Sequence, residues 1–348
     1  MSKSITHIAV IRLSAMGDVA MTVPVIRAFV QQNQGVKITV VSRPFFKPFF
    51  DDIPNVNFFA VDVKGRHKGT MGLFALYADL KKLKIDAVAD LHNVLRSIVI
   101  RNLFALSGKK IAYTDKGRAD KKALTRAENK IFAPVKPMID RHVDTFKNLG
   151  FFVDVTNPVF PEKAQLSADI IRVSAEKEKQ YWIGIAPFAQ YDSKVYPLDL
   201  MQKVIDDLAS NPHSKLFLFG GGKEETEKLN RLSQGKQHVI VVAGKLSFKQ
   251  ELDLISNLDV MLSMDSGNAH IAAMLGVKVV TLWGATHPYA GFKPFHQPFD
   301  NCLTADREKY PLLPTSVYGN KNVPGYEDAM RTIPVAKVVN RIQSQLTL

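Results

Sequence analysis

The sequence predicts an α/β protein with two successive domains, each built on a doubly wound parallel sheet. Short apolar runs alternate with amphipathic segments in the first half of the chain, and the same alternation restarts in the second half. The strand-like runs are apolar without a period of two, as expected for parallel strands buried on both faces. A length of 348 residues accommodates two domains of ordinary size.

The composition indicates a globular protein with ample core, since 46% of the residues are hydrophobic and 23% are charged. Cys302 is the only cysteine, so an intramolecular disulfide is impossible and a reducing compartment is expected. The N-terminus lacks the pattern of a signal peptide, and no window approaches the roughly 20 apolar residues of a membrane span. We therefore expect a soluble, cytoplasmic protein.

The formal net charge of +13 favours an anionic partner, which could be nucleic acid, an anionic bilayer surface or a phosphorylated substrate. The sequence holds no helix-turn-helix signature, no RNP pattern and no cysteine–histidine finger, so nucleic acid is not expected as a partner. The alternative is that the charge only marks a basic, solvated surface.

The elements of the first half follow the alternation in order. Strands are expected at residues 7–12, 37–42, 56–63, 85–91 and 110–113. Helices are expected from the loop after the first strand to about residue 30, and at 44–52, 71–84, 96–106 and 139–150. Residues 113–136 are rich in lysine and arginine and are expected to form a basic, partly helical loop that binds phosphate or carboxylate groups. Such runs are often only solvated faces.

The second half repeats the pattern after a connection near residues 161–179. Strands are expected at 181–186, 215–219, 239–242, 260–262 and 278–283, and helices at 198–209, 247–257 and 333–346. We expect domains at residues 1–165 and 166–348, with the last helix packing back on the first domain. Residues 290–326 show no regular pattern.

A strand–turn–helix unit at residues 258–288 carries the chemistry. Asp265 leaves the carboxyl end of a buried strand, which is the edge where open α/β sheets bind ligands. The amides of Gly267, Asn268 and Ala269 have no partner inside the helix that follows, so they favour an anion such as a phosphate. The alternative is that Ser266 or Asp265 merely caps the helix.

This unit resembles the signature of a known family. Its pattern D-S-G-x-x-H-[IL]-A-A-x-L-G, followed by a strand and G-x-T-x-P, is similar to that of the ADP-heptose:lipopolysaccharide heptosyltransferases, glycosyltransferase family 9. The matching residues are Asp265, Ser266, Gly267, His270, Ala272, Ala273, Leu275, Gly276, Gly284, Thr286 and Pro288. The opening stretch I-R-x-S-A-M-G-D-V-x-x-T-x-P resembles the family's first motif.

The resemblance implies a fold and an activity. The fold would be GT-B, in which two Rossmann-like domains face a cleft that holds the site. The activity would be inverting transfer of heptose from ADP-heptose to the inner core of lipopolysaccharide, without a metal or cofactor. The acceptor would be anionic, and peripheral contact with the inner face of the inner membrane is expected.

The resemblance also assigns roles to individual residues. Asp18, which follows Gly17 in the first motif, matches the family's general base; the alternative is an acid that caps a helix. Lys194 matches a lysine that contacts the donor phosphates, although Tyr196 stands where the pattern usually has tryptophan. The remaining donor residues would be Asp265, Ser266, Gly267, Asn268, His270, Gly221 and Glu224. The acceptor residues would be Gly17, His92, Arg96, Lys121 and Lys122.

Alternatives to this function stay open at this point. A transferase could use another nucleotide sugar, and a nucleotide-sugar epimerase could use the same fold, because fold alone does not determine function. A binding protein without turnover is a third alternative, against which the joint presence of Asp18, Lys194 and Asp265 argues. The glycines at residues 220–222 do not form a Walker A loop, and a tight strand-to-helix turn accounts for them equally well.

Overall fold

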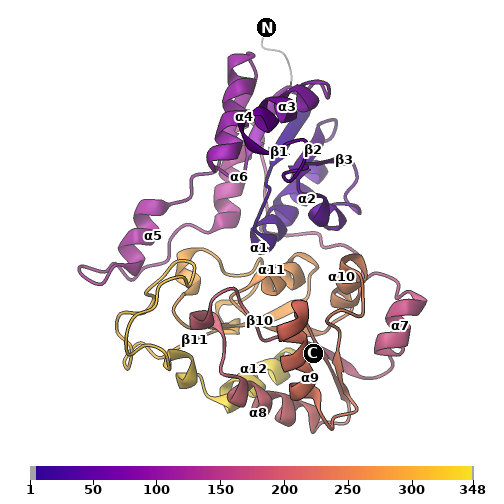
Figure 1. The fold of residues 1–348 in the computed structure, drawn as a ribbon, viewed down its shortest axis with the longest axis vertical. Coiled ribbons are helices and arrows are strands. Elements are labelled where there is room, and N and C mark those ends of the chain that lie inside the picture. The colour runs from indigo at the N-terminus through magenta and orange to yellow at the C-terminus, as the bar shows by residue number, and fades with distance from the viewer. Residues whose placement is uncertain (1–4, 347–348) are drawn as a thin grey trace. The chain divides into compact units, whose positions relative to one another are not determined.

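A computed structural model describes residues 5–346 of the chain as two compact units (Figure 1). The first unit comprises Met1–Gly117 and Lys136–Val159. The second comprises Phe160–Leu348 together with the segment Arg118–Val135, which interrupts the first unit in the sequence. Each unit contains one parallel sheet covered by helices, which confirms the fold class expected from the alternation of strands and helices.

The first unit has five parallel strands in the order β3-β2-β1-β4-β5. The strands are β1 (His7–Ile11), β2 (Lys37–Ser42), β3 (Val56–Ala60), β4 (Ala87–Asp90) and β5 (Lys110–Tyr113). The helices are α1 (Met16–Ala20), α2 (Thr22–Gln32), the 3-10 helix η1 (Pro44–Phe49), α3 (Gly69–Lys81), α4 (Leu95–Leu106) and α6 (Met138–Leu149). The expected strands and helices of this half are thus confirmed to within a few residues.

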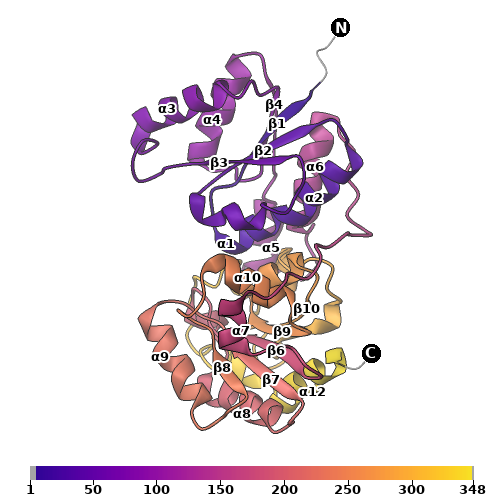
Figure 2. The same ribbon diagram turned by 90° about the vertical axis from the view of Figure 1, so that its right-hand side faces the viewer.

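The helices of the first unit cover both faces of its sheet (Figure 2). Leu76 and Leu80 of α3 and Ile100 and Phe104 of α4 are buried against the same strands. On the other face α2 packs on α6, where the Phe29 and Phe146 rings have centroids 4.7 Å apart. Burial on both faces explains why these strands are apolar without alternation.

The second unit has six parallel strands in the order β11-β10-β9-β6-β7-β8. The strands are β6 (Tyr181–Ala186), β7 (Ser214–Leu218), β8 (Val239–Val241), β9 (Val260–Met264), β10 (Lys278–Trp283) and β11 (Cys302–Thr304). The longer helices are α5 (Arg118–Thr125), α7 (Ala168–Ser174), α8 (Leu198–Ala209), α9 (Gly222–Ser233), α10 (Phe248–Ser256), α11 (Gly267–Met274) and α12 (Val335–Leu346). Single turns of 3-10 helix are η2 (Asp192–Lys194), η3 (Pro288–Ala290), η4 (Phe299–Asn301) and η5 (Ala329–Thr332).

Three features of the second unit differ from the sequence-based expectation. The last helix was expected to pack back on the first domain, but Val338 and Ile342 of α12 are fully buried in the core of the second unit. α7 and β11 lie in stretches where no regular element was expected. The expected boundary after residue 165 differs from the observed division after Val159.

A fourth difference concerns residues 118–135, which the sequence placed in the first domain. They belong to the second unit because their aromatic and basic side chains pack there. The Phe132 ring has its centroid 4.9 Å from that of Tyr289, and the Arg307 guanidinium lies 3.4 Å from the Phe132 centroid. Lys130 Nζ donates to the Pro314 carbonyl at 2.7 Å.

Candidate functional site

Both sheets place the residues predicted for the site at a topological switch point. In the first sheet the strand order reverses between β1 and β4, and in the second between β6 and β9. Loops that leave the carboxyl ends of two such strands turn away from each other, which opens a ligand crevice. Asp18 and His92 follow β1 and β4, and Lys194 and Asp265 follow β6 and β9.

In the second unit, Asp265 joins three segments that are distant in sequence. It is 8% exposed, and its Oδ2 accepts from Lys194 Nζ at 3.1 Å and from the Thr286 hydroxyl at 2.9 Å. The Lys194 side chain is 12% exposed. A lysine ammonium carries three donors, so Lys194 can bind Asp265 and a phosphate oxygen together. The other carboxylate oxygen, Oδ1, can accept a further hydrogen bond.

Close backbone approaches fix the loop that carries Lys194. The Ala285 amide donates to the Ser193 carbonyl at 3.1 Å. A Cβ on Gly284 would lie 2.5 Å from that carbonyl oxygen, so only glycine fits there. The Ser193 hydroxyl donates to the Gly319 carbonyl at 2.6 Å, and the stem of Lys194 passes where a Cβ on Gly319 would be. Lys194 is therefore held on two sides.

The turn after β9 leaves the first amides of α11 without a side-chain cap from Ser266. Ser266 is the N-cap residue, but its side chain makes no capping bond and instead lies 3.1 Å from the Ser263 hydroxyl. The alternative in which Ser266 merely caps the helix is therefore wrong for this side chain. Gly267 and Asn268 open α11, and His270 in the same turn is 7% exposed. The amides at this end suit an anion.

In the glycine turn after β7, one acidic residue caps a helix and the other pairs with a lysine. Glu225 Oε2 accepts from the Gly221 amide at 2.8 Å and so caps α9, the helix that follows. The side chain of Glu224, one of the predicted donor residues, is 82% exposed and pairs with Lys228 at 2.6 Å. This pairing lowers the pKa of the Glu224 carboxyl. The structure therefore places Gly221 in a structural turn, and the donor role of Glu224 stays a prediction.

In the first unit, Asp18 stands beside a fixed arginine. Its Oδ2 lies 2.5 Å from Arg12 Nη2 and accepts from the Ala15 amide at 3.3 Å. Arg12 is 5% exposed and also donates to the carbonyls of Ser14 and Leu91, both at 2.8 Å. The Asp18 side chain is 31% exposed and therefore accessible. Gly17 precedes it in α1.

His92 lies on the neighbouring strand end and is uncharged at neutral pH. Burial lowers its pKa to about 3, with smaller contributions from the nearby charges of Arg12 and Lys116. Its Nδ1 accepts from the Leu13 amide at 3.4 Å. A neutral imidazole with so low a pKa is a poor proton acceptor at neutral pH.

The other predicted acceptor residues are scattered. Arg96 Nη1 donates to the His67 carbonyl at 2.8 Å within the first unit. Lys121 and Lys122 lie on α5 in the second unit. Lys121 is 4% exposed, with its Nζ 4.1 Å from the centroid of the Phe292 ring, whereas Lys122 is exposed. The structure thus gives Lys121 a packing role.

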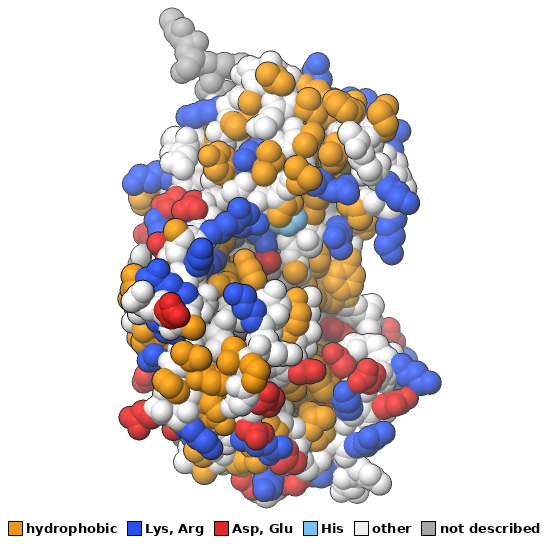
Figure 3. All heavy atoms as spheres, turned by 60° about the vertical axis from the view of Figure 1, so that its left-hand side comes forward, with side chains coloured by type: hydrophobic (Ala, Val, Ile, Leu, Met, Phe, Trp, Pro, Cys, Tyr) orange, Lys and Arg blue, Asp and Glu red, His pale blue; other side chains and the backbone are white. Residues whose placement is uncertain are grey.

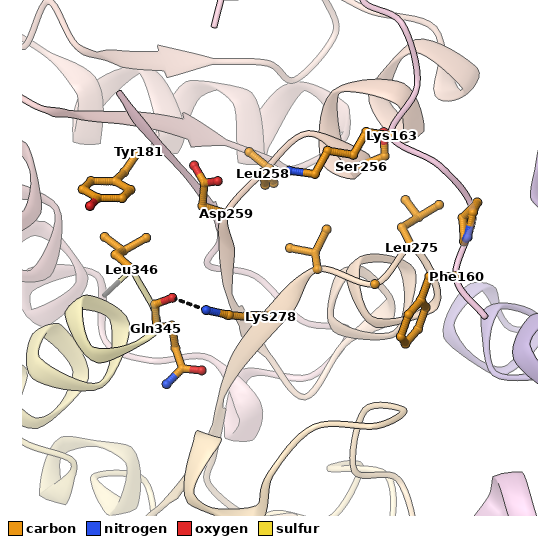
Figure 4. Close-up of a pocket in the computed structure, with 13 residues that line it drawn as sticks. Phe160, Lys163, Tyr181, Ser256, Leu258, Asp259, Leu275, Lys278, Gln345 and Leu346 are labelled. Carbon is orange, nitrogen blue, oxygen red and sulfur yellow. Dashed lines mark hydrogen bonds between the residues drawn. The ribbon is translucent and has the colours of Figure 1, made fainter. Parts of the chain in front are cut away.

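One pocket of about 430 Å³ in the second unit lies away from Lys194 and Asp265 (Figure 4). Its lining includes Tyr181 and Lys278, the first residues of β6 and β10, and Asp259 before β9. It therefore lies at the amino edge of the second sheet, opposite to the edge that carries Lys194 and Asp265. Lys278 Nζ donates to the Gln345 carbonyl at 2.7 Å within it.

Most residues of this site could be named from the sequence, but two parts could not. Thr286 was matched only as part of G-x-T-x-P, yet its hydroxyl orients Asp265. The loop that contains Gly319 had no pattern that could reveal its contact with Lys194. Within residues 5–346, no group of three or more histidine, cysteine, aspartate or glutamate side chains could hold a metal ion.

Comparisons with known proteins agree with these observations. Residues 73–318 match the family model described as "Glycosyltransferase family 9 (heptosyltransferase)". Lipopolysaccharide heptosyltransferase 1 of Campylobacter coli is 25% identical over 303 residues, which cover 81% of this chain and 85% of the relative.

Two solved structures share the fold. The glycosyl transferase family 9 protein of Veillonella parvula is 18% identical with a TM-score of 0.76, covering 99% of this chain and 98% of its own. The E. coli heptosyltransferase WaaC, solved with ADP, is 19% identical with a TM-score of 0.67, covering 97% and 99%. These likenesses confirm the fold class over nearly the whole chain.

Proposed function

Because the chain belongs to glycosyltransferase family 9, the heptosyltransferase family, we propose that it is an inverting glycosyltransferase acting on the inner core of lipopolysaccharide. The donor is ADP-heptose and the acceptor is an anionic core sugar. The observation that carries the proposal is the contact of Lys194 and Thr286 with Asp265 at the switch point of the second sheet. Relatives named as lipopolysaccharide heptosyltransferases, and one solved with ADP, support the substrates.

The residues of the second unit suit a nucleotide diphosphate sugar. Lys194 and the amides that open α11 bind the diphosphate, and Asp265 accepts from sugar hydroxyls. As the bond from the anomeric carbon to ADP breaks, negative charge grows on the diphosphate. Donors that are already fixed in place stabilise that charge at no cost in reorganisation. This cationic arrangement supports transfer without a divalent metal.

Asp18 of the first unit is the proposed base. An acceptor hydroxyl attacks the anomeric carbon on the face opposite to ADP, which inverts the configuration, and its proton passes to the Asp18 carboxylate. The ion pair with Arg12 orients this carboxylate. Because an ionised aspartate beside a guanidinium is a weak base, the proton moves late, as the new bond forms.

The experiment that tests this function is turnover with chemically defined substrates. The purified protein is incubated with ADP-heptose and a heptose-free inner-core acceptor in the presence of a chelator. We expect one heptose on the acceptor, of inverted configuration, for each ADP released, and much slower turnover with UDP- or GDP-linked sugars. Conversion of the donor without acceptor would identify an epimerase, and a requirement for added magnesium or manganese would contradict the metal-independent mechanism.

A further inference from the structure

The outer surface of α3 and α4 exposes large apolar side chains. Met71 and Phe74 of α3 are 79% and 50% exposed, and Leu95 and Leu106 of α4 are 78% and 85% exposed. They make up four of the twelve large apolar side chains exposed in residues 5–346. Isolated exposed apolar residues need no explanation, but a group on two adjacent helices does.

The two helices form one layer. The Tyr77 and Phe104 rings pack edge to face with centroids 5.0 Å apart, and Arg96 at the start of α4 bonds the His67 carbonyl just before α3. Both helices bury their inner sides in the same core. Their exposed apolar residues therefore look out from the same side of the first unit, and we call this set of four the α3–α4 face.

The α3–α4 face is surrounded by positive charge. Residues 64–84 and 95–110 contain ten lysines and arginines and a single acid, Asp79. One of the ten, Arg101, is buried and pairs with Asp90, so the other nine and Asp79 leave a surplus of eight positive charges. Lys64, Lys68, Lys81 and Lys84 are exposed at the two ends of α3. In Figure 3, apolar side chains lie among basic ones over the first unit, at the top of the view.

This combination identifies the partner. A second copy of the chain would bring the same positive charges against each other, which disfavours self-association. Nucleic acid would neutralise the lysines but would leave the leucines and methionine in water. An anionic bilayer satisfies both features, since its headgroups attract lysines while its acyl boundary buries apolar side chains.

We propose that the α3–α4 face docks the protein on an anionic phospholipid bilayer. Met71 and Leu95 stand near the first residues of their helices, at the carboxyl edge of the first sheet where Asp18 also lies. Docking would hold this edge close to lipid-borne molecules. The evidence for this surface does not depend on the reaction. Its purpose, which is to meet a lipid-anchored acceptor, rests on the proposed function.

The test is co-sedimentation with vesicles. The wild type is expected to bind vesicles of phosphatidylcholine containing phosphatidylglycerol, to bind pure phosphatidylcholine much less, and to be released by salt. Replacing Met71, Phe74, Leu95 and Leu106 by glutamine should weaken binding about tenfold or more, because buried apolar area is lost. These side chains are exposed, so the variant should fold, as circular dichroism and thermal melting will show.

A matched control uses exposed apolar side chains elsewhere in the same unit. Phe152 and Val159 are 73% and 60% exposed, and their replacement by glutamine should leave vesicle binding unchanged. A charge variant, Lys68→Glu with Lys81→Glu, should weaken binding to phosphatidylglycerol vesicles, while Lys147→Glu should not. Equal binding by the wild type and the apolar variant would overturn the proposal, as would equal binding to both vesicle types.

Two further measurements separate this proposal from its alternatives. A dimer seen in sedimentation equilibrium and lost in the apolar variant would show that the α3–α4 face joins two copies, and would overturn bilayer docking. Transfer to a delipidated, water-soluble acceptor should be the same in the wild type and the apolar variant. If the wild type transfers no heptose but binds vesicles through this face, the docking stands and the proposed reaction falls.

Discussion

At the scale of single residues, Asp18 combines a helix contact with an ion pair. Its carboxylate accepts from the Ala15 amide at the start of α1 and pairs with the buried Arg12. An N-terminal contact of this kind stabilises a helix by about 1 kcal/mol, whereas a general base contributes about 100- to 10,000-fold in rate. Loss of the helix contact would therefore lower stability, whereas loss of the general base would lower turnover.

Asp18→Asn should lower turnover about 100- to 10,000-fold, because the amide cannot take a proton. Melting temperature and donor affinity should barely change, since asparagine keeps an oxygen that can accept from the Ala15 amide. Rates at saturating substrates measure the effect. The control is Asp52→Asn, which removes another carboxylate–arginine pair of the same unit, 2.6 Å from Arg27, and should leave turnover near that of the wild type.

Turnover of Asp18→Asn within a few-fold of the wild type would make Asp18 a structural residue. His92 lies at the same sheet edge, but its lowered pKa of about 3 gives it no advantage over a carboxylate as a base at neutral pH. The search would then turn to Asp265, which binds Lys194 and Thr286 in the second unit.

The donor residues show how far sequence can predict a site. Lys194, Asp265 and Thr286 each appeared in a recognisable motif, so their chemistry could be inferred one by one. Their contact could not, because 71 residues separate Lys194 from Asp265 and local patterns carry no information on how distant loops meet. Gly319 was invisible for the same reason, since its role is only to leave room for the stem of Lys194.

At the scale of elements, the segment 118–135 is the clearest case in which composition misled. Its lysines and arginines predicted a basic, partly helical loop of the first domain that binds phosphate or carboxylate groups, with a solvated face as the alternative. Long basic side chains can also pack their stems and stack on rings. Lys121 lies over Phe292, and Arg307 of the second unit lies over Phe132. These contacts and the bonds to the Pro314 and Tyr289 carbonyls attach the segment to the second unit.

Phe132→Ala should loosen this attachment, because the ring contacts Tyr289 and Arg307. Loss of an aromatic pair and a cation–π contact costs about 1–2 kcal/mol. Local opening should then become about 5- to 30-fold more frequent. Limited trypsin digestion measures it, because cleavage at Lys122 and Arg126 follows the open population when opening is fast.

The control for this experiment is Phe152→Ala, which removes an exposed phenylalanine from the first unit. It should leave cleavage between residues 118 and 135 at the rate of the wild type. Equal rates for Phe132→Ala and the wild type would show that the backbone bond from Val135 to Tyr289 and the Lys130 contact hold the segment without the ring.

At the scale of the whole molecule, the alternation of strands and helices was sufficient to predict two parallel sheets. The strand order was not predictable, because the strands are short runs that do not specify their neighbours and pairing depends on contacts across the chain. That order nevertheless brings the motif residues of each unit together, at the switch points β1/β4 and β6/β9. Sequence patterns therefore predicted which loops matter, and topology explains why they meet.

A donor site confined to the second unit has a consequence for the stability of the whole protein. A ligand that binds only the folded state raises its melting temperature. ADP should therefore stabilise the wild type, with or without a chelator, and Lys194→Ala should lose a charge-assisted contact of about 1.5–3 kcal/mol, equivalent to about ten- to a hundredfold in affinity.

Lys177→Ala is the matched control, since Lys177 pairs with Asp259 at 2.9 Å before β9, at the opposite edge of the same sheet. Both variants lose a lysine–aspartate pair, but only Lys194→Ala should lose the ADP-induced shift. Equal shifts in both variants would place the diphosphate away from Lys194 and contradict the donor site.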